Sequence, residues 1–206
     1  MAESQLYADL THWLAANPDL IALAFACIAF AESFAIVGVI VPGVVMLAAA
    51  SFVAGSGALG LPEALAATWF GAVLGDGVSY LIGRRFHASV RNMRPFVNHP
   101  NWLNSAEALF KRYGWLSVVI GRFIGPIRPI IPMTAGALDM NASIFFGVNA
   151  VSAIVWAPVY VLPGYLLGMN IESGFDSVQA ITGMILLVGL ALLISLTARR
   201  LQQKRS

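Results

Sequence analysis

Four ionisable side chains stand inside long apolar stretches of this sequence. Two are acids, Glu32 and Asp76, and two are bases, Arg122 and Arg128. If these stretches enter a membrane, each charge near a helix centre costs about 2.5–3.5 kcal/mol, so four unpaired charges would cost roughly 10 kcal/mol or more. That sum is comparable with the stability of a whole domain. We therefore expect the four groups to be paired, hydrated or close to the membrane surface.

The two arginines lie six residues apart in the segment GRFIGPIRPIIPMTAG, residues 121–136. An unbroken helix would place them about 120° apart around its axis, but Pro126 interrupts the helix between them. The interruption allows both guanidinium groups to face one cavity. Each is a planar fork that suits bidentate contact with phosphate or carboxylate, a geometry that lysine lacks. Residue type and spacing favour a site for an anionic group, and two salt bridges that only hold the fold are the plainer alternative.

The segment around Asp76 predicts a tightly packed helix. Small residues recur at every fourth position, which favours close contact with a neighbouring helix. These residues are Gly71, Gly75, Ser79 and Gly83. Tyr80 lies one turn beyond Asp76 on the same face, so we expect the carboxylate to point into the protein.

The composition is that of a membrane protein. Of the 206 residues, 59% are hydrophobic and 11% are charged, whereas a soluble domain keeps about a quarter of its residues charged. The formal charge of +2 is too small to indicate a nucleic-acid partner. The single cysteine, Cys27, provides neither a disulfide framework nor a metal site. His12, His87 and His99 lie outside the apolar stretches without a nucleophile at catalytic spacing, so we expect no enzymatic activity, metal or cofactor.

Six apolar windows are long enough to enter a membrane. They are residues 20–40, 41–60, 64–82, 113–138, 142–169 and 180–198. The positive-inside rule places two basic segments in the cytoplasm: residues 84–112, which hold six Lys and Arg, and the tail 199–206, which holds four. Parity then requires the window 113–138 to enter from the cytoplasm and return. Its prolines fit a re-entrant hairpin, because broken backbone at membrane depth must be surrounded by protein or water.

The window 41–60 has the same broken character, with Pro42 and Gly43 at its start. We interpret it as a second re-entrant hairpin that enters from the opposite side, which leaves both chain termini in the cytoplasm. The predicted fold class is an all-α integral membrane protein with about four transmembrane helices plus two opposed re-entrant helical hairpins in an inverted-repeat arrangement. Residues 19–198 form the membrane domain, and residues 1–18 form an amphipathic helix that lies in the interface or packs on the protein.

Four stretches carry a resemblance to a known family. They are FAESFAIVGVIVPG (30–43), GDGVSYLIGRRF (75–86), RYGWLSVVIGRFIGPIRPIIPMTAGALDM (112–140) and VWAPVYVLPG (155–164). Together they resemble the DedA family of membrane proteins, which carry the VTT (SNARE-associated) domain, and look most like its YabI-like branch. There are two departures: many relatives have an acid directly after the first Pro-Gly, where this chain has Val44 and Val45, and a proline where this chain has Gly125.

The resemblance implies a bacterial inner-membrane protein related to lipid flippases and scramblases, and it assigns functional roles to Glu32, Asp76, Arg122 and Arg128. We expect an anionic lipid phosphate, preferably undecaprenyl phosphate and otherwise a phospholipid, to bind the arginines. The acids would hold the arginines in the empty site, and Glu32 would couple release to a proton. The residues expected to support this site are Pro42, Gly43, Gly75, Tyr80 and Pro126. Two alternatives stay open: a proton-coupled antiporter for small solutes or drugs, and a structural envelope-stability factor.

Overall fold

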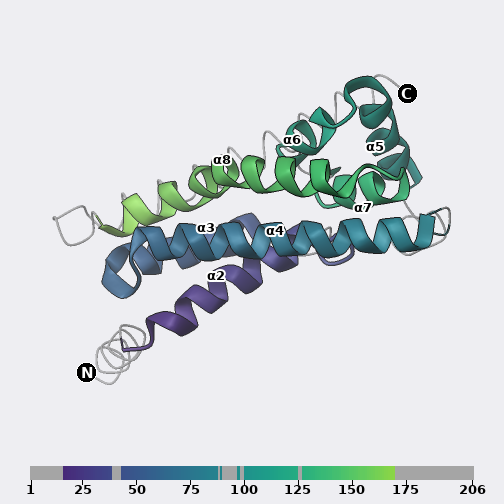
Figure 1. The fold of residues 1–206 in the computed structure, drawn as a ribbon. Helices are drawn as coiled ribbons and strands as arrows, with labels where there is room; N and C mark the ends of the chain where they lie inside the picture. The colour runs from purple at the N-terminus through teal and green to yellow at the C-terminus, as the bar shows by residue number, and fades with distance from the viewer. Residues whose placement is uncertain are drawn as a thin grey trace.

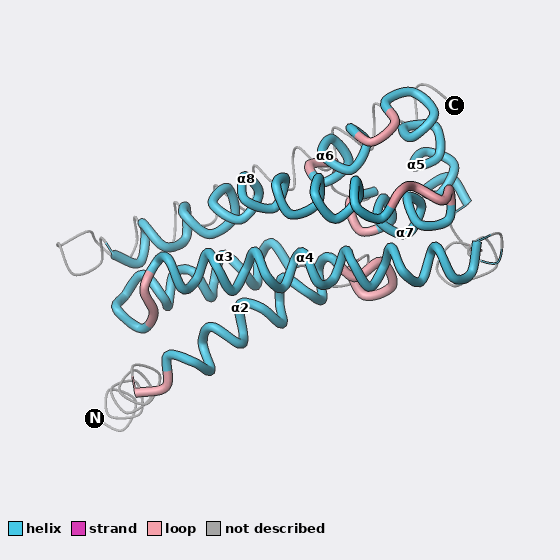
Figure 2. Tube along the Cα trace, in the orientation of Figure 1, coloured by secondary structure: helices cyan, strands magenta, loops and turns pink. Residues whose placement is uncertain are grey.

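The computed structural model describes residues 16–38, 43–87, 89, 97, 100–124 and 127–169. These residues are mostly helical and contain no strand (Figure 2), as the predicted all-α class requires. The helices are α2 (Pro18–Ser33), α3 (Gly43–Val53) with its π-helical extension η1 (Ala54–Ala58), α4 (Leu61–Phe86), α5 (Pro100–Tyr113), α6 (Leu116–Arg122), α7 (Ile130–Ala137) and α8 (Ala142–Met169).

Several predicted features fall outside the described residues. They are the amphipathic helix over most of residues 1–18, the last window at 180–198, the tail at 199–206, most of the loop between residues 87 and 100, and the residues His12, Pro42, His99, Gly125 and Pro126. All four ionisable residues of the apolar stretches lie within the described part of the chain.

Two long helices, α4 and α8, run antiparallel along the molecule (Figure 1). Both are long and apolar enough to cross a membrane: their 26 and 28 residues rise about 39 and 42 Å, more than the ~30 Å hydrocarbon core. Trp69 Nε1 donates a hydrogen bond to the carbonyl of Ala150 at 2.9 Å, and Tyr80 Oη donates to that of Met140 at 2.5 Å. The windows 64–82 and 142–169 are thus confirmed as apolar helices.

The small-residue stripe of α4 supports two helices placed end to end. Gly71 and Gly75 lie against the backbone of α2, with which a methyl group at either position would collide. Ser79 Oγ accepts a hydrogen bond at 2.9 Å from the backbone N–H of Ala35, just beyond α2. Gly83 lies against the backbone of α7. The predicted close packing is confirmed, with two neighbouring helices instead of one.

Helix α2 is shorter than the span predicted for residues 20–40. It runs parallel to α4 and ends at Ser33, beside Gly75. Its 16 residues rise about 24 Å, less than the hydrocarbon core. Helix α3 runs back in the opposite direction, parallel to α8, so α2 and α3 form the first hairpin. Residues 43–58 are apolar and helical up to a kink at Ser56 and Gly57, where the backbone leaves helical geometry. The described residues of the window 41–60 therefore form one arm of the α2–α3 hairpin, which corrects the prediction of a separate hairpin there.

The second hairpin is formed by α6 and α7, within the predicted range 113–138. The chain leaves α6 at Arg122 and begins α7 at Ile130. Helix α7 packs on α4, and α3 packs on α8, where Gly164 and Gly168 meet the α3 backbone. Each hairpin therefore packs one of its helices against the long helix of the other half of the chain.

The direction of α2 also bears on the orientation of the chain. Because α2 is parallel to α4, its first residue lies at the Leu61 end of α4, opposite the basic pair Arg84 and Arg85 (Figure 1). Loop-charge parity predicts the N-terminus on the basic side, because it counts residues 20–40 as a complete span; residues 1–15 lie outside the described residues, so the location of the terminus stays a prediction. A hydropathy window does not separate a half-length helix from a full span when the turn that follows is itself apolar.

Candidate functional site

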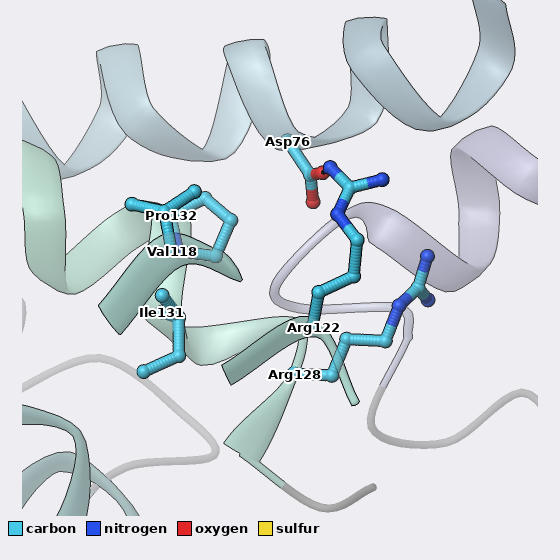
Figure 3. A pocket seen from close by; sticks show the side chains of 6 residues that line it. All are labelled: Asp76, Val118, Arg122, Arg128, Ile131 and Pro132. Carbon is cyan, nitrogen blue, oxygen red and sulfur yellow. Dashed lines mark hydrogen bonds and ion pairs between the residues drawn. The ribbon is translucent and has the colours of Figure 1, made fainter. Parts of the chain in front are cut away.

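The two hairpin tips bring the four predicted ionisable residues together against the middle of α4. Glu32 lies in the last turn of α2, Asp76 lies within α4, and Arg122 is the last residue of α6. Arg128 follows in the turn before α7. The arginines are 3% and 5% exposed, respectively, and the acids are equally buried. Figure 3 shows the Arg122 guanidinium against Asp76 and the Arg128 side chain next to that of Arg122.

Arg122 has one charged partner and one neutral partner. Its Nη2 donates a hydrogen bond to Asp76 Oδ2 and another to the side-chain oxygen of Asn149 on α8. Asn149 is itself oriented, because its Nδ2 donates to the carbonyl of Val73 at 3.3 Å. The guanidinium thus joins the second hairpin to both long helices.

Arg128 has a corresponding set of partners on the first hairpin and α8. Its Nη1 lies 2.9 Å from Glu32 Oε1, and its Nη2 donates to Ser33 Oγ at 3.0 Å. Its Cζ lies 4.2 Å from the ring centroid of Trp156, a cation–π contact. Each arginine therefore keeps a neutral contact from α8 in addition to its acid.

Gly43 and Gly75 support the site by letting backbones approach. A Cβ at Gly43 would lie 2.6 Å from Cβ and from Oε2 of Glu32, so the first turn of α3 closes directly over that side chain. A Cβ at Gly75 would lie 2.5 Å from the carbonyl oxygen of Phe30 and 2.8 Å from Cβ of Ser33. Only glycine at these two positions leaves room for the end of α2, and with it the acid, at its observed depth.

Tyr80 is buried on the same helix as Asp76 and contacts the start of α8. Its Oη donates to the Met140 carbonyl at 2.5 Å and accepts a hydrogen bond from Arg84 Nη1 at 3.0 Å. Its ring stacks on Phe145 with centroids 4.2 Å apart. Tyr80 therefore fixes the start of α8, while Asp76, one turn earlier, pairs with Arg122.

The four ionisable residues leave little empty space between them. Several of their guanidinium N–H groups also lack a hydrogen-bond acceptor among the described residues. A cavity of about 10 Å³, room for about one water molecule, is lined by Asp76, Val118, Arg122, Arg128, Ile131 and Pro132 (Figure 3). Among the described residues, three guanidinium nitrogens lack a hydrogen-bond acceptor: Arg122 Nη1, Arg128 Nε and Arg128 Nη1, the last of which has only its ion contact with Glu32. Chemically, the site offers buried donors to an anion.

Sequence reasoning missed three residues of the site: Ser33, Asn149 and Trp156. The last two lie seven residues apart in the charge-free window 142–169, a spacing that puts them on one face of a helix. Neither residue is ionisable, so the cost of burying a charge does not identify them. Their signal in the sequence is a shared face on an otherwise apolar helix. His87, the described histidine of the sequence, lies elsewhere, exposed and 3.0 Å from Asp139 Oδ1.

Comparisons with known proteins agree with the resemblance seen in the motifs. The VTT domain model matches residues 41–166. Inner membrane protein YabI of Escherichia coli K12 is 33% identical over 174 residues, 84% of this chain and 68% of that protein. Inner membrane protein YqjA of the same strain is 29% identical over 158 residues, 74% of this chain and 71% of that protein. No solved structure matches the chain.

A third relative, an uncharacterized membrane protein of Buchnera aphidicola, is 32% identical over 145 residues, 70% of this chain and 57% of that protein. The names of YabI and YqjA place both in the inner membrane, which supports the same location for this chain. The chain belongs to the VTT-domain family, the DedA family of membrane proteins.

Proposed function

We propose that this protein moves lipids with an anionic phosphate head group across the bacterial inner membrane, and that it does so without catalysing a reaction. The observation that carries the proposal is the pair of buried arginines where two hairpin tips meet. Arg122 Nη1 and Arg128 Nε have no hydrogen-bond acceptor within the described part of the chain. Surplus guanidinium donors suit a ligand that brings several acceptor oxygens.

The acids explain how the arginines stay buried when no lipid is bound. Asp76 pairs with Arg122 and Glu32 pairs with Arg128, so the ionised cluster is neutral. A phosphate that takes the arginines displaces at least one carboxylate, and a displaced carboxylate at this depth is costly unless it takes up a proton. We assign that proton to Glu32, whose Oε2 has no hydrogen-bond partner among the residues described. Lipid binding and release are then coupled to protons.

Within the part of the chain that the structure describes, the site is closed to a phosphate head group. A cavity of about 10 Å³ holds a water molecule but not a phosphate head group. Transport therefore requires the hairpin tips to separate. The reciprocal packing of α3 on α8 and of α7 on α4 suits that motion, because inverted repeats expose a midplane site to each side in turn.

Undecaprenyl phosphate is the preferred substrate, and phospholipids are the second choice. A phosphate monoester presents three terminal oxygens, whereas the phosphodiester of a phospholipid presents two. Two guanidinium forks that each bind two oxygens are better satisfied by the monoester. The lipid chain stays in the bilayer during transport, so the protein needs no cavity for it.

The test is head-group translocation in liposomes that contain the purified protein and a fluorescent or isotopically labelled polyprenyl phosphate. We expect Arg122→Ala and Arg128→Ala to abolish translocation, and Arg85→Ala, an exposed arginine at the end of α4, to retain it. Wild-type rates in both site variants would contradict the proposal.

A variant without an unpaired charge keeps the test interpretable if a single substitution prevents folding. Asp76→Asn combined with Arg122→Gln removes both charges of one pair and keeps polar side chains of similar size. We expect this double variant to insert and to remain monodisperse in detergent while translocation is lost. Retained translocation would show that the charge pair serves the fold alone.

The two buried acids give a specific reason to test one alternative, proton-coupled export of small cations. In vesicles with an imposed pH gradient, an antiporter would accumulate a cationic dye and would lose it when the gradient collapses. For lipid transport we expect no dye accumulation above protein-free vesicles. A purely structural pair predicts instead that Asp76→Arg with Arg122→Asp restores growth or envelope integrity, which an anion site does not permit.

A further inference from the structure

The interface between α3 and α8 contains buried polar atoms that the arginine cluster does not use. Trp156 Nε1 on α8 and Ser51 Oγ on α3 both belong to residues with 0% exposure, and neither has a hydrogen-bond partner among the described residues. Buried polar groups in native proteins nearly always have partners, and leaving one without a partner is costly. Two such groups at one helix interface therefore need an explanation.

These polar atoms form a row that begins at Arg128. Trp156, Tyr160 and Gly164 recur at every fourth position of α8 and so share one face. The ring of Trp156 covers the Arg128 guanidinium and lies 4.7 Å, centroid to centroid, from the ring of Tyr160. Ser51 lies opposite Gly164, where a Cβ would be 2.9 Å from that of Ser51. The row leads from the arginines towards the Met169 end of α8.

Tyr160 connects the two ends of this row. Its side chain is partly exposed, and its ring packs at 4.7 Å on the ring of Trp156, which in turn covers Arg128. Tyr160 is thus placed to pass a polar group between the exterior and the buried arginine.

The same section of α8 contains two prolines that weaken its backbone hydrogen bonding. Pro158 and Pro163 lie inside the helix, and each proline removes one backbone hydrogen bond from it. Close contact with α3 and its extension is made by glycine against backbone at Gly55, Gly164 and Gly168, beside buried side chains such as Leu47 and Val161. Interrupted helices beside a midplane site are typical of the moving parts of transporters.

We propose that the α3–α8 interface is the route of the phosphate head group between Arg128 and the membrane face opposite the basic end of α4, with Trp156 as its gate. This inference rests on the proposed lipid transport. In the closed state the indole covers Arg128. When α8 bends, the indole N–H, the Tyr160 hydroxyl and the Ser51 hydroxyl bind phosphate oxygens in turn. The small cavity is lined instead by residues of α4, α6 and α7 together with Arg128.

Ser51→Ala, Tyr160→Phe and Trp156→Phe test the route, because each removes one hydrogen-bonding group and keeps the packing or the aromatic face. Each variant should lower the translocation rate about fivefold, the effect of one lost hydrogen bond. Retention of polyprenyl phosphate at the arginines, measured by native mass spectrometry, should stay within about twofold of wild type. Thr68→Val is the matched control, since the Thr68 hydroxyl is buried and bonded within its own helix, to the Ala64 carbonyl at 2.7 Å.

If Ser51 has only a structural role, Ser51→Ala should not lower the translocation rate. Removing an unsatisfied buried hydroxyl should leave the melting temperature unchanged or raise it, and translocation would equal that of wild type. Wild-type rates in all three variants, together with loss of transport in Arg128→Ala, would overturn the route and leave the proposed function intact. Absence of lipid translocation by the wild-type protein would overturn both.

Discussion

Gly75→Ala is the sharpest test of how α4 positions the site. The new methyl group would lie 2.5 Å from the Phe30 carbonyl oxygen and 2.8 Å from Cβ of Ser33, so α2 must move away from α4. Overpacking of this kind costs about 1–3 kcal/mol, and alanine returns about 0.5–1 kcal/mol through its helix propensity. We expect a net loss of roughly 1–2 kcal/mol.

The loss should extend to function because Ser33 and Glu32 hold Arg128. The assay is thermal unfolding of the purified protein in detergent, followed by head-group translocation in liposomes. Gly147→Ala is the matched control, since no atom lies within 4 Å of a Cβ at that helical position. It should raise stability by about 0.5–1 kcal/mol and leave transport unchanged. Equal melting temperatures for Gly75→Ala and Gly147→Ala would refute the packing argument.

Two further predictions concern the charge pair and the orientation of the first hairpin. Asp76→Asn should destabilise the protein by about 3–5 kcal/mol, because the Arg122 charge stays buried without its acid. Adding Arg122→Gln should recover most of that loss. A double-mutant cycle by thermal unfolding measures the coupling, and additive losses would contradict the pairing. The second prediction uses single cysteines, Ala16→Cys or Arg85→Cys, in a Cys27→Ala background. Because α2 runs parallel to α4, the two cysteines should react with a membrane-impermeant maleimide from opposite sides of the membrane. Labelling from the same side would contradict that direction.

The sequence predicted the pairing of charges better than the course of the helices. The energetic argument that four buried charges need partners gave the right groups, and the structure pairs Arg122 with Asp76 and Arg128 with Glu32. Loop charges also indicated that the arginine window turns back. These arguments work because charge burial is costly whatever the fold.

The first hairpin was misjudged because hydropathy measures length and polarity but not direction. Residues 34–38 are as apolar as a helix interior, yet the chain turns there. The seven-residue spacing of Asn149 and Trp156 marked a shared helix face, but the sequence did not show that this face lies against the arginines. The helical spacing of Asp76 and Tyr80 correctly predicted that both point into the protein, but it could not predict that the Tyr80 hydroxyl bonds to the start of α8.

The small-residue stripe on α4 sets the distance between the two hairpins along that helix. Gly75 sets the position of one hairpin and Gly83 that of the other, an interval of eight residues, or about 12 Å along the axis. Inserting one residue between them would turn α7 by about 100° relative to α2, and inserting four would restore the face but add about 6 Å. Either change separates the arginines from Glu32 without altering any residue of the site. The spacing of two glycines on a third helix thus determines whether the acids and the arginines meet at all.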